Sequence, residues 1–161
     1  MYKALDLFEK NMKTLYENSA EGYDREGKIL ELGDNSTNGA RYIVVEQESA
    51  SPGDSLIGFT HMRFCNDDDD LPPNEQKPVL YIYEIQVSST HRGKSIGTAM
   101  MKLCEEIARA TFCSKLVLTV FKNNKSAVRF YMDKMSFEVD ETDPSIFEDD
   151  EADYYILSKR V

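Results

Sequence analysis

The chain has 161 residues, of which 41% are hydrophobic and 30% charged. This length and composition predict a single soluble domain over residues 1–161 and exclude a disordered, collagen-like or disulfide-dense chain. The 29 acidic residues outnumber the 19 basic ones, which gives a formal net charge of -10. Direct binding to nucleic acid is therefore disfavoured, because it requires Lys and Arg to neutralise phosphates, whereas a basic peptide or a polyamine suits this charge.

The three cysteines, Cys65, Cys104 and Cys113, have no spacing typical of a disulfide framework or a zinc site. We therefore expect a reducing, intracellular environment and no bound metal. No apolar run approaches the roughly 18 residues that span a bilayer. The N-terminus has neither a signal-peptide core nor a myristoylation glycine. These features predict a protein of the nucleus and cytoplasm with no membrane partner.

The first third of the chain predicts two helices and a hairpin. Apolar residues from Leu5 to Tyr16 recur at three- and four-residue intervals, which is typical of an amphipathic helix. A shorter helix is predicted over residues 25–32. Residues 40–48 and 55–64 are rich in strand-forming residues and flank a turn at 51–54, so they predict an antiparallel pair.

The next segment predicts a long acidic loop and then a buried strand. Residues 65–78 hold four consecutive aspartates and three prolines, which favour a loop that joins no central strand. Residues 79–87 are apolar or aromatic on both faces except for Glu84 and Gln86, as expected in mid-sheet. A lone carboxylate such as Glu84 is unusual in that setting.

The second half alternates between helices and strands. After a connector at 88–94, a clean apolar face predicts a helix over residues 96–108. The remaining elements predicted are a strand at 115–121, a helix at 126–135, a short strand at 137–139 and a closing strand at 154–158. Between the last two strands, residues 140–153 are mostly acidic and predict a solvated loop.

The connector ends in a turn that is suited to binding phosphate. Residues 92–97 read R-G-K-S-I-G and match R-x-x-G-x-G, with Ser95 at the first glycine. Such a turn presents backbone N–H groups at a helix N-terminus, where the helix dipole also favours negative charge, so it can cradle a pyrophosphate. An ordinary strand-to-helix turn explains the hexapeptide equally well.

A second motif makes the first one specific. Residues 124–131 read N-K-S-A-V-R-F-Y and match N-x-x-A-x-x-F-Y, followed by Met-Ser-Phe at 135–137. Together the two motifs resemble the GNAT acetyltransferase superfamily, which uses acetyl-CoA. The resemblance implies an α/β GNAT fold with a mixed, mostly antiparallel central sheet flanked by helices. The residues it assigns to the cofactor are Ile85, Gln86, Val87, Arg92, Gly93, Lys94, Ser95, Ile96, Gly97, Thr98, Asn124 and Tyr131.

Flanking segments narrow the resemblance to the N-alpha-acetyltransferase D (NatD) family. The segments NMKTLYE, GYDRE, HMRF, LYIYEIQ, LTVFKNN and YYILSKR carry it, from residue 11 to residue 160. Members of that family acetylate the N-terminal amine of histones four and two-A, which begin Ser-Gly-Arg-Gly. The resemblance therefore implies a monomeric protein N-terminal acetyltransferase with basic histone tails as partners, which suits the acidic net charge.

The resemblance assigns the general base to Glu84, with Tyr83 beside it as the second catalytic residue. An α-amino group has a pKa near 7.7 to 8.0 and is already partly neutral at physiological pH, so a mild base acting through water suffices. The alternative is a structural carboxylate paired with Arg63 or Arg41. Strict alternation also places Tyr83 and Glu84 on opposite faces of the strand.

The residues that the resemblance assigns to the peptide substrate are Tyr16, Cys65, Asn66, Asp67, Tyr81, Tyr83, Thr119 and Tyr154. Tyr16, Thr119 and Tyr154 fit a packed core equally well. Cys65 stands where the family has an Asp that follows the H-x-R-F strand. Asp67 is the nearest replacement anion, or else it belongs to a solvated acidic loop.

Two other functions remain open at this point. The same fold with a different acceptor would acetylate lysine, a polyamine or another small amine. An inactive module that binds acyl-CoA or histone tails is favoured by the departures at Ser95 and Cys65, and it is opposed by the presence of Glu84, the tyrosines and Asn124.

Overall fold

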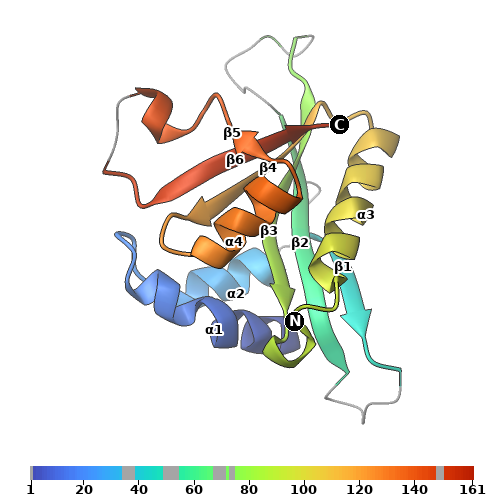
Figure 1. The fold of residues 1–161 in the computed structure, drawn as a ribbon, viewed down its shortest axis with the longest axis vertical. Coiled ribbons are helices and arrows are strands. Elements are labelled where there is room, and N and C mark those ends of the chain that lie inside the picture. The colour runs from blue at the N-terminus through green and yellow to red at the C-terminus, as the bar shows by residue number, and fades with distance from the viewer. Residues whose placement is uncertain (1, 34–38, 49–54, 67–71, 73–74, 148–150) are drawn as a thin grey trace. The chain divides into compact units, whose positions relative to one another are not determined.

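The computed structural model describes residues 2–33, 39–48, 55–66, 72, 75–147 and 151–161. The helices are α1 (Tyr2–Glu17), α2 (Arg25–Gly33), α3 (Ile96–Ala110) and α4 (Lys125–Arg129). The strands are β1 (Arg41–Glu46), β2 (Leu56–Asn66), β3 (Pro78–Val87), β4 (Lys115–Phe121), β5 (Glu138–Val139) and β6 (Tyr154–Arg160). The strands form a mixed sheet in the order β1-β2-β3-β4-β6-β5 (Figure 1).

The chain divides into two compact units. The first unit is Met1–Arg63 with Tyr83–Met100, and the second is Phe64–Ile82 with Met101–Val161. The C-terminal half of β3 therefore belongs to the first unit and its N-terminal half to the second. None of the helices in the described residues is long and apolar enough to cross a membrane.

The first unit is built on α1, α2 and the β1–β2 pair. The apolar stripe of α1 supplies Leu5 and Phe8 to a buried cluster with Leu32 of α2 and Phe59 of β2. The two strands pair antiparallel, from Arg41 opposite Met62 to Glu46 opposite Leu56. The predicted helices and antiparallel pair are confirmed, while the predicted turn at 51–54 lies outside the described residues.

The second unit is a sheet with parallel and antiparallel pairs. Strand β3 runs parallel to β4 in the register Leu80–Leu116, and β4 runs antiparallel to β6 in the register Leu118–Leu157. Strand β5 pairs antiparallel with β6. The apolar residues that are buried in this unit include Leu80, Leu116, Leu118, Phe137 and Leu157. The predicted strand at 115–121 has the observed bounds.

The structure corrects the predicted loop at 65–78. Strand β2 continues to Asn66, so Cys65 and Asn66 lie in a strand, and Pro78 is the first residue of β3. A proline is tolerated there because the first residue of a strand needs no ladder N–H. Asp67 lies outside the described residues.

The predicted helix over 126–135 is also modified. Helix α4 ends at Arg129, and Phe130–Lys134 form a π-helical turn instead. Met135 caps the turn, and the next residue, Ser136, has a left-handed φ of 59°. At the C-terminus, β6 extends to Arg160 and lies between β4 and β5, so the predicted closing strand is not the edge of the sheet.

A close backbone approach in the first unit provides a test. Gly58 of β2 lies so near β3 that an added Cβ would be 2.9 Å from the carbonyl oxygen of Gln86. We expect Gly58→Ala to lower the free energy of unfolding by about 1–3 kcal/mol, as overpacked substitutions do. Urea unfolding measures this change in the free energy of unfolding, and a midpoint equal to that of the wild type would contradict the close approach.

Candidate active site

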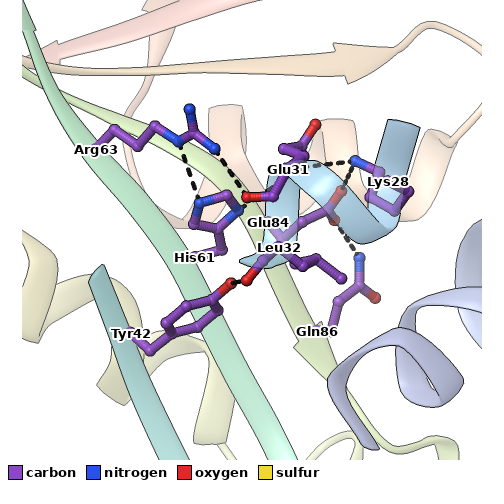
Figure 2. A network of polar contacts seen from close by, with 8 residues as sticks. All are labelled: Lys28, Glu31, Leu32, Tyr42, His61, Arg63, Glu84 and Gln86. Carbon is purple, nitrogen blue, oxygen red and sulfur yellow. Dashed lines mark hydrogen bonds and ion pairs between the residues drawn. The ribbon is translucent and has the colours of Figure 1, made fainter. Parts of the chain in front are cut away.

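Glu84 lies on the buried face of β3 in the first unit. Ile82, Glu84 and Gln86 are all buried, and Glu84 is 5% exposed. Its Oε1 is 3.0 Å from Lys28 Nζ, and its Oε2 accepts a 2.7 Å hydrogen bond from Gln86 Nε2 (Figure 2). Both carboxylate oxygens are therefore held by donors.

Lys28 is the cation that pairs with Glu84. It extends from α2, on the same buried face as Leu32, and also pairs with Glu31 Oε1 at 2.8 Å. Its Nζ lies 4.6 Å from the ring centroid of Phe8 and 5.3 Å from that of Tyr16. The ammonium is thus surrounded by two carboxylates and two aromatic faces, which is a favourable environment for a buried cation.

The arginines that the sequence suggested as partners of Glu84 are engaged elsewhere, which corrects that alternative. Arg63 donates a 2.8 Å hydrogen bond to the backbone oxygen of Glu31, and Arg41 donates to the backbone oxygens of Gly39 and Ala40. Glu84 does have a buried cationic partner, but it comes from α2 and not from β1 or β2.

Burial and charge shift the proton affinities of this cluster. Burial raises the pKa of Glu84 above its ordinary value, and the Lys28 charge and the Gln86 hydrogen bond limit that rise. Burial alone would lower the pKa of Lys28, but the negative charges of Glu84 and Glu31 raise it, so the lysine stays protonated. Burial, with the Glu84 charge, raises the pKa of Tyr16 to about 12. Tyr16 therefore remains a neutral phenol.

A stack of rings adjoins Glu31 in the same unit. The buried His61 ring lies 5.1 Å from the Tyr42 ring and 5.1 Å from the Tyr83 ring, and both pairs are stacked. The Arg63 guanidinium lies 4.9 Å from the Tyr83 centroid. Tyr83 is thus a partly exposed aromatic residue whose neighbours, His61 and Arg63, both contact Glu31 of α2, the helix that also supplies Lys28. These contacts do not bear out the strict alternation that places Tyr83 and Glu84 on opposite faces.

Glu31 connects this stack to Lys28. His61 Nδ1 is 3.7 Å from Glu31 Oε1, which is an ion-pair distance and too long for a hydrogen bond. Burial raises the pKa of Glu31, but His61 and the Lys28 charge outweigh that effect and leave it below its ordinary value. Glu31 therefore stays ionised beside Lys28.

Three predicted substrate residues share one face of the second unit. Tyr81 and Thr119 are joined by a hydrogen bond between their hydroxyls. Tyr154 of β6 is the register partner of Phe121, which follows Thr119 by two residues and so lies on the same face of β4. Thr119 is exposed and both tyrosines are half-buried, so this face is not a packed core.

The other predicted site residues of the second unit lie on other segments of the chain than Tyr81, Thr119 and Tyr154. Cys65 is half-buried and Asn66 exposed at the end of β2. Asn124 caps α4, with its Oδ1 accepting from the Ala127 N–H at 3.3 Å. Tyr131 is 8% exposed and packs edge-on against Phe137. Their assigned roles stay predictions.

The turn at residues 92–97, the candidate phosphate-binding turn, has a strained backbone. Gly93 and Ser95 have φ values of 76° and 62°, so Ser95 adopts the left-handed conformation that favours a glycine. Helix α3 starts at once, because the Ala99 N–H donates to the Ser95 carbonyl at 2.9 Å. The amides of the first turn that follow Ser95 then have no intrahelical acceptors.

The first turn of α3, just after this segment, contains an unsatisfied polar atom. Thr98 Oγ1 is buried and has no hydrogen-bond partner among the described residues. Residues 92–95 are exposed. Free amides, a positive helix end and an unsatisfied hydroxyl fit the pyrophosphate of coenzyme A. In contrast, no group of three His, Cys, Asp or Glu within the described residues is placed to hold a metal ion.

The sequence alone did not identify Lys28, Asn11, Glu31 or His61 as parts of the polar cluster around Glu84. The available signal was a lysine on the buried face of the second helix, four residues before Leu32. Asn11 similarly lies on α1 and donates to the side-chain oxygen of Gln86 at 2.9 Å. A lone polar residue on a buried face indicates a partner without identifying it.

The family comparison agrees with the fold. The model of the acetyltransferase (GNAT) family matches residues 4–137. N-alpha-acetyltransferase 40 of Saccharomyces cerevisiae is 43% identical over 61 residues, which cover 34% of this chain and 21% of the yeast protein. The match thus spans about a fifth of the length of that curated relative.

Solved structures with this fold include two acetyltransferases that cover almost the whole chain. Arabidopsis thaliana NAA60 in complex with a bisubstrate analogue has a TM-score of 0.68 at 17% identity, over 99% of this chain and 94% of that one. The PaiA N-acetyltransferase of Thermoplasma acidophilum in complex with coenzyme A has a TM-score of 0.64 at 18% identity, over 99% and 92%. The predicted GNAT fold is confirmed.

The buried ion pair makes a pH-dependent prediction. We expect Lys28→Met to lower the free energy of unfolding by about 3–5 kcal/mol at neutral pH, because it leaves Glu84 buried and unpaired. Without Lys28, the pKa of folded Glu84 rises further above its unfolded value. Protonation then relieves the penalty, so the loss is smaller at pH 5 than at pH 8.

Denaturant unfolding at both pH values measures this loss. Lys13→Met is the matched control, since Lys13 is exposed, pairs with Glu17 at 3.8 Å and lies 5.9 Å from the Tyr23 ring centroid, and the substitution is expected to change stability little at either pH. An equal loss at pH 5 and pH 8 in Lys28→Met would contradict the ion-pair explanation.

The left-handed backbone of Ser95 predicts a substitution that raises stability. We expect Ser95→Gly to raise the free energy of unfolding by up to about 1 kcal/mol, because glycine removes the Cβ strain at this φ. Ser126→Gly, in helix α4, should instead destabilise by about 0.5 kcal/mol. Chemical denaturation compares the two, and a loss of stability in Ser95→Gly would refute the strain.

Proposed function

The chain belongs to the acetyltransferase (GNAT) family, and we propose that it is a protein N-alpha-acetyltransferase of the NatD type. Acetyl-CoA supplies the acetyl group as a thioester. The acceptor in this proposal is the N-terminal amine of histones four and two-A, which begin Ser-Gly-Arg-Gly. The sequence match to the yeast N-alpha-acetyltransferase 40 and the six NatD-like segments support this choice.

The observation that carries the proposal is the buried Glu84 carboxylate with its raised pKa. A general base works best when its pKa lies near the operating pH, and burial moves Glu84 in that direction. Lys28 and Gln86 each donate to one oxygen of Glu84 and so occupy two acceptor sites, whereas an ionised carboxylate offers about four. Glu84 therefore retains the capacity to take a proton through a water.

The proposed reaction is a direct transfer in a ternary complex. The amine nitrogen forms a bond to the thioester carbonyl, the carbon–sulfur bond breaks, and the coenzyme A thiolate leaves. The amine proton passes through water to Glu84. Because an α-amino group has a pKa near 7.7 to 8.0, this base needs much less strength than a lysine acceptor would demand.

The charge of the chain supports a basic partner. The net charge of -10 attracts a Lys- and Arg-rich tail and speeds its association. In this proposal Tyr16 and Tyr83 of the first unit contact the peptide, and so do Tyr81, Thr119 and Tyr154 of the second. Cys65 stands at the position of the family's Asp beside the substrate arginine, and in this proposal Asp67 supplies the replacement anion, with Cys65 and Asn66 as further substrate contacts. The proposed working form is a monomer in the nucleus and cytoplasm.

The test is acetyl transfer to a Ser-Gly-Arg-Gly-Lys peptide with a free or a blocked N-terminus. We expect mass spectrometry to find one acetyl group on the α-amine of the free peptide and little product from the blocked one. Glu84→Gln should lower kcat by about 100-fold or more, the usual contribution of a general base.

Glu138→Gln, on the exposed strand β5, is the matched control and should keep the wild-type rate. Circular dichroism confirms that each variant is folded. Equal acetylation of the blocked peptide would favour a lysine acceptor and overturn the N-terminal assignment. A folded Glu84→Gln with the wild-type rate would remove Glu84 from the chemistry.

A further inference from the structure

A continuous line of hydrogen bonds leads from the phosphate-binding turn to Glu84 within the first unit. Arg92 Nη2 donates to Asn11 Oδ1 at 2.6 Å. Asn11 Nδ2 donates to Gln86 Oε1 at 2.9 Å, and Gln86 Nε2 donates to Glu84 Oε2 at 2.7 Å. Two side-chain amides therefore connect a guanidinium of the turn with the proposed base.

The direction of this line is fixed by its two ends. A guanidinium can only donate and an ionised carboxylate can only accept, so Arg92 requires the oxygen of Asn11 and Glu84 requires the nitrogen of Gln86. The middle hydrogen bond then runs from Asn11 to Gln86, as observed. Flipping either amide would break two of the three bonds.

The surroundings hold this line in place. Asn11 Nδ2 also donates to the Val87 carbonyl at 3.1 Å, and Arg92 Nε donates to the same carbonyl at 3.3 Å. Gln86 is only 5% exposed, so a broken partner would leave a buried amide unsatisfied. The end of β3 is therefore tied both to α1 and to the start of the turn.

We propose that Asn11 and Gln86 are positioning residues that couple Arg92 of the phosphate-binding turn to the orientation of the Glu84 carboxylate. The inference rests on the proposed role of Glu84 as base and deepens it. In this arrangement Gln86 supports the ionised carboxylate from the side opposite Lys28. Both amides act through Glu84 and neither touches the reacting atoms.

The coupling has a pH signature that a purely structural role would lack. Removing the Gln86 donor takes away a hydrogen bond to the charged form of Glu84 and so raises its pKa further. The acid limb of the kcat/KM profile reports the base of the free enzyme, and it should move to higher pH. The charged or titratable groups that face Glu84 and its partners are unchanged in the variants: Tyr16, Lys28, Glu31, Tyr42, His61 and Arg63.

The experiment compares pH profiles of the intact chain with the Ser-Gly-Arg-Gly-Lys peptide. Gln86→Met should move the acid limb upward by about one pH unit, the size of one charge-assisted hydrogen bond. It should lower kcat at neutral pH. Asn11→Asp keeps an acceptor for Arg92 but loses the donor to Gln86, so it should move the limb in the same direction.

Two matched controls separate this effect from added charge or lost polarity. Asn18→Asp places the same new carboxylate just after α1, and Gln47→Met changes an exposed glutamine after β1. Neither should move the acid limb. An acid limb that stays at the wild-type pH in Gln86→Met and Asn11→Asp would overturn the coupling while leaving Glu84 as base.

A second readout needs no activity. Arg92 and Gln86 are linked through Asn11, so their effects on the free energy of unfolding should be non-additive in a double-mutant cycle of Arg92→Met and Gln86→Met. The non-additivity should disappear in an Asn11→Ala background. Additive losses would overturn the link to Arg92. A wild-type rate in Glu84→Gln would overturn the proposed base and this inference together.

Discussion

Burying the Lys28–Glu84 ion pair carries a large desolvation cost, and the arrangement around it follows from offsetting that cost. One ammonium and one carboxylate out of water are tolerated only when their remaining donors and acceptors are also satisfied. Glu31 and two aromatic rings complete the surroundings of Lys28, and Gln86 does so for Glu84. Helix α2 is therefore held to β3 by charge, and to α1 and β2 by the packing of Leu32.

This constraint also explains why a carboxylate is kept in a buried strand. An apolar residue at position 84 would pack without any desolvation cost, and Lys28 would then have no need to lie beneath the strand. Instead, Lys28 of α2, with Glu31 beside it, pairs with the carboxylate of Glu84 and keeps it ionised and oriented. Such an arrangement is typical of functional sites, where burial and nearby charges shift the pKa values of the side chains. The adjacent stack of Tyr42, His61 and Tyr83 adds rigidity on the neighbouring strands.

Much of the fold was predictable because its signals are local. The period of α1, the alternation of β3 and the apolar run of β4 each depend on residues within one element. The two motifs at 92–97 and 124–131 likewise identify the family from short segments. The π-helical turn at Phe130–Lys134 escaped prediction because its apolar spacing resembles that of an α-helix over so few residues.

The site was less predictable because its contacts are not local. The position of Glu84 indicated that a cation must be near, but 56 residues separate it from Lys28, and the nearer arginines were the natural candidates. Asn11 is 75 residues from Gln86. Such pairings depend on how helices pack on strands, which no short sequence pattern specifies. The face formed by Tyr81 and Thr119 was closer to prediction, since the two strands were both identified.

The same line of polar contacts limits how the sequence can change over evolution. Replacing Lys28 leaves Glu84 uncompensated, and replacing Glu84 leaves Lys28 beside a single half-buried carboxylate, so either change alone lowers stability. Asn11 and Gln86 are similarly tied, because each amide is oriented by the other. Among relatives, these four positions should therefore be retained or exchanged as a set, while exposed positions such as Lys13 vary independently.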